Sequence, residues 1–475
     1  MLEQLKGYLM LGAVAVLLVA IILGAGYFIV YKKIFKGKKK LSKKTMIVGA
    51  IFICYIIVVL SATLLDRFGM WMDPNNINAM ERSRLFSSYR EAWNNFSFTE
   101  WRNLILNIML FIPFGFLLPM LSGRFKKFWK TYVLGLLLTV VIEFTQLITG
   151  RGVFEIDDIL NNFVGTMIGF GLYMFVDFIV GKIRKQETKV IPVILVQFPL
   201  LITVIFFISI GVVYNNQEFG NLKSKYSVKM FMKDIEIKSD VNMSEENPQR
   251  EVYKCEKLTR EETVNKARKI FEQLGSKMDD SRTDYYDETV VCYGEDGNSV
   301  WLDYAGGTTH YNMFSQMFDE DENRIENDTN ADEKEIKNAL EKMGIKIPKG
   351  VSFVRYDNGT YSFKAEQILD GDIMYDGFLT CEYNINHEIM SVDNEIVQYN
   401  KYKTVKLRSE KDAFEDIKAG KFKHYVKMEK IHIKDVEIGY EMDSKAFYQP
   451  VYKFKATYND NEEEEEDIII SAIEK

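Results

Sequence analysis

Six long apolar runs in the first half of the sequence constrain the fold more than any other feature. Each run contains 18 to 25 mostly apolar residues, and they cover 8–31, 45–65, 103–121, 132–149, 159–181 and 190–214. A helix of that length crosses about 30 Å of hydrocarbon. The first run is longer than a signal-peptide core and is followed by lysines, which favours a retained helix over a cleaved signal peptide. We therefore predict about six transmembrane helices.

Basic side chains gather in alternate loops between these runs. Residues 32–44 carry eight lysines, and the loops at 122–131 and 182–189 carry four lysines or arginines each. The loops at 66–102 and 150–158 hold six arginines and no lysine. The positive-inside rule places the lysine-rich loops in the cytoplasm, so the N-terminus and everything after the last apolar run are predicted to lie outside. Topology accounts for the lysines, and we expect no nucleic-acid partner.

The charge balance differs between the two halves of the chain. Residues 1–214 carry 23 basic and 12 acidic side chains, whereas residues 215–475 carry 37 basic and 55 acidic ones. With 47% hydrophobic residues, the chain is not a largely disordered protein. The second half is predicted to be an acidic, folded domain.

Polar residues stand at the junction of the fourth and fifth runs. Glu143 and Gln146 are three residues apart, so they share one face of a helix near its end. Arg151 follows in a turn flanked by glycine. Asp157 and Asp158 begin the fifth run, where carboxylates cap a helix and favour its positive end. We expect these five side chains to lie together near the outer membrane interface.

Small and helix-disrupting residues mark the third and fifth runs. Those in the third run are Asn107, Pro113 and Gly115. The proline frees a backbone carbonyl that needs another partner. In the fifth run, Asn162, Gly165 and Gly169 lie on one helical face, and the two glycines allow close approach of another helix.

Two interpretations of these polar residues stay open. In the first, the arginine binds a phosphate or carboxylate in an outward cavity, and a carboxylate acts as acid or base on an envelope substrate. In the second, the charges form a salt-bridged cap that pins the fourth and fifth helices together. No nucleophile or set of metal ligands accompanies the carboxylates, so the catalytic residue is unknown and enzyme activity stays an open question.

The order and spacing of these residues resemble the VanZ-like family of bacterial membrane proteins. The resemblance covers about residues 45–182 and rests on Asn107, Phe111, Pro113, Gly115, Glu143, Gln146, Arg151, Asp157, Asp158, Asn162, Gly165 and Gly169. The segment 87–103 is similar to the outer loop that leads into this motif in Gram-positive members. The resemblance implies a role in resistance to lipid-bearing glycopeptide antibiotics such as teicoplanin. This chain departs from a minimal member by its large second domain.

The second domain shows three helix patterns, each followed by strand patterns. The helices are predicted at 259–275, 331–344 and 409–420, and each ends on a glycine. Thr259 and Glu262 form a capping box, and Asn358-Gly359 is predicted to be a tight hairpin turn. The fold class is therefore an α-helical polytopic membrane domain followed by an α+β extracytoplasmic domain of helix-plus-antiparallel-sheet units. These units weakly resemble PepSY-like, YcdB-type, cystatin-like modules.

Cysteine and histidine positions predict little chemistry. Cys255, Cys292 and Cys381 allow either one disulfide and a free thiol or three thiols. The four histidines, at 310, 387, 424 and 432, show no metal-ligand spacing, so we expect no metal site and no cofactor. The acidic run within 459–470 lacks the spaced ligands of a calcium loop and is predicted to be a solvated hairpin turn.

The predicted domains are an N-terminal transmembrane helix with a lysine-rich loop (1–44), a VanZ-like membrane domain (45–182), a last transmembrane helix (183–214) and an extracytoplasmic α+β domain of two or three units (215–475). We expect a multi-pass cell-membrane protein that acts on or protects the cell envelope. Its expected partners are membrane lipids and a lipid or cell-wall precursor ligand. The alternative is a non-catalytic sensor, in which the outer domain binds a peptide or a peptidase and the membrane helices are an anchor.

Overall fold

The computed structural model describes residues 42–65, 84–149, 154–318, 323–423, 428–459 and 461–473. The chain divides into two compact units, here called unit 1 and unit 2, with the change between them after Glu218. The first predicted span, 8–31, lies outside the described residues, and so does Arg151.

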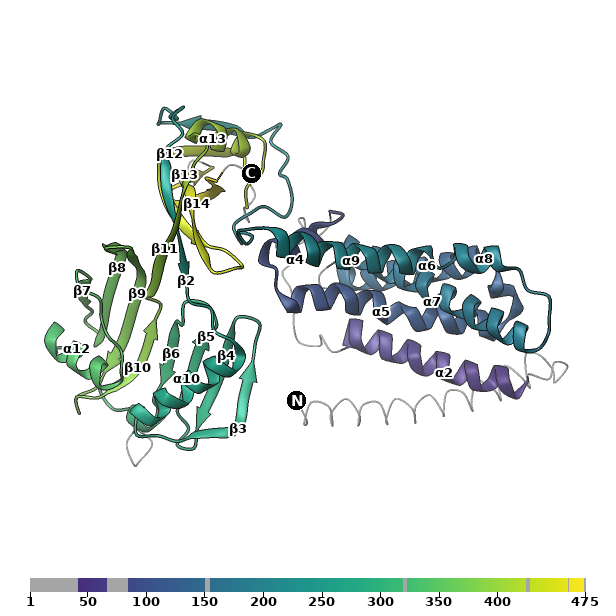
Figure 1. Cartoon of the computed structure of the whole chain (residues 1–475), viewed down its shortest axis with the longest axis horizontal. Helices are drawn as coiled ribbons and strands as arrows, with labels where there is room; N and C mark the ends of the chain where they lie inside the picture. Colours follow the sequence, from purple (N-terminus) through teal and green to yellow (C-terminus); the bar gives the residue numbers. More distant parts are fainter. Residues whose placement is uncertain are drawn as a thin grey trace. The chain divides into compact units, whose positions relative to one another are not determined.

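Unit 1 is built from helices (Figure 1). They are α2 (Lys43–Leu60), continued by a wider helical turn η2 (Ser61–Leu65), α4 (Ser87–Asn95), α5 (Phe98–Leu121), the short turn η3 (Gly123–Lys126), α6 (Phe128–Thr149), α7 (Ile156–Ile183), α8 (Val190–Leu195) and α9 (Phe198–Asn216). Five segments of the described chain are long and apolar enough to cross a membrane: α2 with most of η2, α5, α6, α7, and α8 with α9. Five of the six predicted spans therefore correspond to such helices.

Two details of unit 1 differ from the sequence expectation. The predicted outer loop contains a helix, α4, and α5 already begins at Phe98, because Ser97 accepts a hydrogen bond from the Glu100 amide and caps the helix there. The last predicted span is interrupted between α8 and α9. Pro199 stands in the first turn of α9, where its missing N–H costs nothing. The Gln197 side chain donates to the Gly171 carbonyl of α7 at 2.9 Å and fixes this junction.

Unit 2 is a mixed sheet with helices packed on it (Figure 1). Its strands are β1 (Glu236–Ser239), β2 (Gln249–Cys255), β3 (Met278–Tyr285), β4 (Thr289–Gly294), β5 (Ser299–Asp303), β6 (Thr309–Asn312), β7 (Ser352–Arg355), β8 (Thr360–Asp370), β9 (Ile373–Tyr383), β10 (Ile389–Asn394), β11 (Val397–Lys406), β12 (Lys430–Met442), β13 (Phe447–Tyr458) and β14 (Asn461–Ser471). The main path of the sheet runs β1-β12-β13-β2-β11-β9-β10-β6-β5-β4-β3. Neighbouring strands are antiparallel except for β1, which is parallel to β12. The α+β class is confirmed.

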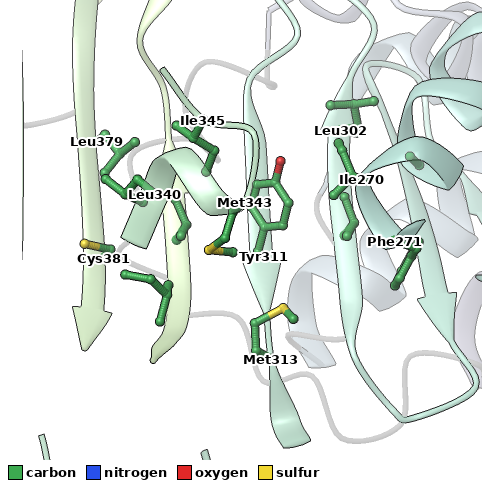
Figure 2. Close-up of a cluster of buried hydrophobic side chains, with 14 of the residues drawn as sticks. Ile270, Phe271, Leu302, Tyr311, Met313, Leu340, Met343, Ile345, Leu379 and Cys381 are labelled. Atoms are coloured by element: carbon green, nitrogen blue, oxygen red, sulfur yellow. The ribbon is translucent and has the colours of Figure 1, made fainter. Parts of the chain in front are cut away.

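Three larger helices cover separate parts of this sheet. They are α10 (Arg260–Gln273), α12 (Glu333–Lys342) and α13 (Glu410–Lys418); a single turn, α11 (Phe314–Met317), follows β6. Figure 2 shows the core beneath α10 and α12, where Phe271 and Leu340 are fully buried with Leu302 and Leu379 of the strands. A second core lies between α13 and β12–β14 and contains Phe454. Each helix therefore packs on the sheet through the apolar face that its sequence predicts.

The local signals in unit 2 are confirmed with one exception. Thr259 and Glu262 form the capping box of α10, and Gly359 has a φ of 78° in the β7–β8 turn. The acidic run was predicted to be a solvated turn, and this is wrong, because β14 begins at Asn461 and continues through the acids. Its pairing with β13 places Asp467 opposite Lys455, and unlike charges across a strand pair stabilise the sheet.

All four cysteines are unpaired. The three in unit 2 are buried, and burial raises the pKa of the thiols of Cys255 and Cys292 to about 11 and of Cys381 to about 12. The ordinary value for a cysteine thiol is about 8.5. Of the two arrangements that the sequence left open, the structure has three thiols.

Candidate functional site

The Asp157 carboxylate lies fully buried at the start of α7 and caps another helix. Its two oxygens accept hydrogen bonds from the backbone N–H groups of Phe86 (2.6 Å) and Ser88 (2.9 Å). These amides belong to the first turn of α4, whose own N-cap residue, Phe86, makes no side-chain cap. The positive end of α4 and two of its unpaired amides thus receive a carboxylate from α7. Asp157 was predicted to cap its own helix, but the N-cap position of α7 is Glu155.

Glu143 accepts a hydrogen bond from a backbone amide at the start of α7. It lies near the end of α6 and is only 2% exposed. Its Oε2 accepts a hydrogen bond of 3.1 Å from the backbone N–H of Glu155. The Glu155 carboxylate in turn accepts a hydrogen bond from the Ser88 hydroxyl at 3.0 Å. These contacts join α4, α6 and α7 through polar groups.

Asp158 connects the next helix. The Asn107 side chain of α5 donates a hydrogen bond to Asp158 Oδ1. Asn107 and Asp158 are both half-buried. Five of the predicted residues, Asn107, Glu143, Gln146, Asp157 and Asp158, therefore lie at one end of the bundle, where α6 ends and α7 begins.

Three buried carboxamides complete this end of the bundle. The Gln146 amide donates to the Thr63 carbonyl at 3.0 Å, and the Asn162 amide donates to the Thr139 hydroxyl at 2.9 Å. Asn161 accepts a hydrogen bond from the Tyr89 hydroxyl. Each carboxamide is at most 4% exposed. We call Asn107, Glu143, Gln146, Asp157, Asp158, Asn161 and Asn162 the polar cluster.

Each of these carboxamides keeps one buried atom without a hydrogen-bond partner among the described residues. The atoms are Gln146 Oε1, Asn161 Nδ2 and Asn162 Oδ1. An unsatisfied buried polar group costs about 1–3 kcal/mol, so native proteins rarely leave several in one place. Within the described residues, Gln146 and Asn162 therefore each keep a buried acceptor without a partner, and Asn161 keeps a buried donor.

The predicted glycines allow α5 and α7 to pack closely where the two helices cross. A Cβ on Gly165 would lie 2.0 Å from the Ile108 carbonyl oxygen, and one on Gly169 would lie 2.0 Å from that of Ile112. A Cβ on Gly115 would lie 2.0 Å from the Thr166 carbonyl oxygen. The two backbones therefore touch. Pro113 lies within α5 along this crossing and outside the polar cluster. This contact of backbones is what brings Asn107 of α5 to Asp158 of α7.

The sequence pattern missed several members of this site. Asn161 is not among the predicted site residues, although it and its neighbour Asn162 both follow Asp158 by about one helical turn. Tyr89 and Ser88 lie in the segment predicted to be a loop, and no sequence signal places them against α7. All four histidines occur after residue 309. Within the described residues, the polar cluster offers carboxylates and carboxamides, and the hydroxyls of Ser88 and Tyr89 lie beside it.

Unit 2 has a concave surface of its own. A cleft of about 780 Å³ lies between β2, β11, α10 and the turn at Gly306 and Gly307. Three lysines, Lys254, Lys266 and Lys401, line it together with a single carboxylate. Lys401 also forms an ion pair with Glu251 at 3.4 Å.

Comparisons with known proteins bear on the membrane part. Residues 52–177 match the model of the family described as VanZ/LLP1. A curated relative, "Protein VanZ" of Enterococcus faecium, is 33% identical over 94 residues, which are 19% of this chain and 56% of the relative. The chain thus spans a little over half the length of this relative. The predicted resemblance to the VanZ-like family is confirmed for this segment, and the chain is a membrane protein.

A solved structure similar to the chain is the C-terminal domain of YpeB from Bacillus megaterium. It is 8% identical, and the match covers 46% of this chain and 94% of that domain with a TM-score of 0.19. Nothing about the function of unit 2 follows from a likeness of this degree.

Proposed function

We propose that the polar cluster of this VanZ-like membrane protein binds the polar headgroup of an envelope lipid or lipid-linked cell-wall precursor. Binding there would lower susceptibility to lipid-bearing glycopeptides such as teicoplanin, the role that the family resemblance implies. The observation that carries the proposal is the set of three buried carboxamide atoms without partners, on Gln146, Asn161 and Asn162. Headgroups rich in hydroxyl and amide groups supply the donors and acceptors that these atoms need.

The charge distribution supports an outward-facing cluster. The ends of α5 and α7 opposite the cluster carry the basic loops 122–131 and 182–189, with four lysines or arginines each. By the positive-inside rule that end faces the cytoplasm. The cluster then faces outward, and α9, which runs back from the basic end, leads unit 2 to the outer side. This orientation gives the cluster access to envelope precursors.

The experiment compares teicoplanin susceptibility in cells that carry the intact chain, Gln146→Met or Asn162→Leu. Both substitutions keep side-chain size and remove the carboxamide. We expect both to return susceptibility to that of cells with an empty vector, while membrane abundance stays equal. Native mass spectrometry of the purified chain should show a bound lipid that is lost in both variants.

The matched control is Thr145→Val. Thr145 is the neighbour of Gln146, but its hydroxyl donates within α6, to the Val141 carbonyl at 2.7 Å. Resistance that survives Gln146→Met would contradict a role for the cluster. Resistance and abundance that fall together would indicate that the cluster only holds the helices. An intact chain without any effect on susceptibility would remove the resistance role.

A second candidate function rests on the cleft in unit 2. Its three lysines favour an acidic peptide, and peptide capture would make the protein a sensor or a regulator of a peptidase. Fluorescence anisotropy of a labelled poly-glutamate peptide with the intact chain in nanodiscs tests this. Lys266→Gln should weaken binding, whereas Lys269→Gln removes a charge from the same helix outside the cleft and should not. Equal binding by both variants would dismiss the cleft as the site.

A further inference from the structure

Three side chains with metal-binding atoms converge in unit 2, and none of them lines the cleft. They are Asp328, Glu335 and His387, and one ligand atom of each lies within 4.8 Å of the others. Asp328 stands in the loop before α12, Glu335 in the first turn of α12, and His387 in the turn between β9 and β10. Because His387 follows Glu335 by 52 residues, the spacing of the histidines gives no sign of the group.

Backbone hydrogen bonds hold the loop of Asp328 against the β9–β10 turn. The Asp328 amide donates to the Tyr383 carbonyl at 2.9 Å, and the Ile385 amide donates to the Glu326 carbonyl at 3.0 Å. The Tyr361 hydroxyl also donates to the Asp328 carbonyl at 2.7 Å. The position of Asp328 therefore does not depend on a bound ion.

The turn that carries His387 is fixed in the same manner. Asn384 is fully buried, and its Oδ1 accepts hydrogen bonds of 3.0 Å from the amides of Asn386 and Glu388. His387 itself has a φ of 63°, in the left-handed region that non-glycine residues seldom adopt. The conformation that turns this imidazole toward α12 is thus maintained by the side chain of Asn384.

Glu335 meets the histidine directly. Its Oε1 lies 2.9 Å from His387 Nδ1, and the Tyr383 hydroxyl donates to the same oxygen at 3.3 Å. A hydrogen-bonded phenol that orients a carboxylate is the kind of outer contact that supports metal ligands.

We propose that Asp328, Glu335 and His387 bind one Zn²⁺ ion. An imidazole nitrogen with two carboxylate oxygens and no thiolate suits Zn²⁺, and three protein ligands leave one position for water or an outside ligand. The ion would tie the loop before α12 and α12 itself to the β9–β10 turn. Two other described histidines, His310 and His432, have no such trio and form ion pairs with Asp393 (3.9 Å) and Asp240 (2.8 Å).

The test measures Zn²⁺ binding to the intact chain. The protein is purified in nanodiscs with a tag free of histidine, treated with a chelator, and titrated with Zn²⁺ by calorimetry. Co²⁺, which substitutes for Zn²⁺ and absorbs visible light, gives a second readout. We expect one equivalent to bind, His387→Gln and Asp328→Asn to lose it, and Tyr383→Phe to weaken it about tenfold.

His310→Gln is the matched control, because it removes an exposed histidine beside a single carboxylate. Circular dichroism of each variant shows that unit 2 is folded, and Glu335→Gln is a further variant if one of the others misfolds. No binding by the intact chain would overturn the proposal. Binding that survives both His387→Gln and Asp328→Asn would also overturn it, because the ion would then be held elsewhere.

Discussion

The two units of this chain sort their side chains in opposite ways. In unit 1, large apolar side chains such as Ile148 (79% exposed) lie on the outside, while Asp157 and Asn161 are fully buried. In unit 2, Phe271 and Leu302 are fully buried, and the carboxylates lie mainly at the surface. Unit 1 thus exposes many large apolar side chains and buries several polar ones, although it also buries Phe111 and Ile142.

The different burial of apolar and polar side chains shows that different forces stabilise the two units. Burial of apolar area from water stabilises unit 2 by about 25 cal/mol per Å². Acyl chains around unit 1 are as apolar as its side chains, so this force is weak between its helices. Close backbone approach at glycines and buried hydrogen bonds take its place. Substitutions of one kind should therefore have very different effects in the two units.

The largest expected effect breaks the core of unit 2. Phe271→Ala should lower the free energy of unfolding of unit 2 by about 3–5 kcal/mol, because it leaves a cavity beneath α10. Phe144→Ala likewise removes a phenyl ring, but the Phe144 side chain is about half exposed on α6. This change should alter the free energy of unfolding by about 0.5 kcal/mol or less. Hydrogen exchange of the intact chain in detergent, read separately for each unit, measures both. Equal losses would refute the comparison.

The next effect tests the backbone contact in unit 1. Gly165→Ala places a methyl group against the Ile108 carbonyl and should cost about 3 kcal/mol, the upper part of the usual range for overpacking. Gly211→Ala in α9 meets nothing within 4 Å and should be neutral or stabilise the helix by about 0.5–1 kcal/mol. Thermal stability in detergent distinguishes them. A tolerated Gly165→Ala would mean that α5 and α7 do not need their close approach.

A smaller expected effect tests whether the buried carboxylate of Asp157 stabilises unit 1. Asp157→Asn replaces an acceptor of two backbone hydrogen bonds and should cost about 2 kcal/mol, because one amide of α4 loses its partner. Asp177→Asn lies on the same helix, but its carboxylate is about half exposed and pairs with the exposed Lys126, so the change should cost less than about 0.5 kcal/mol. The midpoint of thermal unfolding of the detergent-solubilised chain is the measurement. Matching midpoints would show that burial adds nothing to this carboxylate.

The smallest expected change concerns the three thiols of unit 2. With pKa values of about 11 to 12, about one in a thousand or fewer is ionised at pH 8, whereas an ordinary thiol is roughly a quarter ionised. Iodoacetamide should therefore leave Cys255, Cys292 and Cys381 unmodified in the folded chain. Mass spectrometry of proteolytic fragments detects the adducts, and the chain in guanidinium is the control that reacts fully. Rapid alkylation without denaturant would show that water reaches these cores.

Local sequence rules predicted elements that are stabilised locally. The capping box at Thr259 and Glu262 and the turn at Gly359 depend on neighbours within a few residues, so the sequence alone identifies them. The apolar runs predicted the spans for the same reason. The acids of β14 were misread, because their strand conformation depends on pairing with β13, which no local pattern encodes.

The candidate site was predictable only in part. Glu143 and Gln146 share a helical face by their spacing, and both are buried on it. The partners of Asp157 are backbone amides of a distant helix, and a backbone amide leaves no mark in the sequence. The spacing of Asp328, Glu335 and His387 does not reveal the trio, because hydrogen bonds between the loop before α12 and the β9–β10 turn bring it together.

The cap that Asp157 provides for α4 has a consequence for biosynthesis. Asp157 follows Phe86 by 71 residues, so α4 emerges from the ribosome well before its cap has been synthesised. Asn107 likewise enters the bilayer before Asp158 exists to accept its hydrogen bond. The amides of α4 and the Asn107 side chain therefore lack these partners until α7 inserts. A nascent chain that stops before α7 is expected to be a substrate for membrane quality-control proteases, and insertion of α7 is the step that releases it from them.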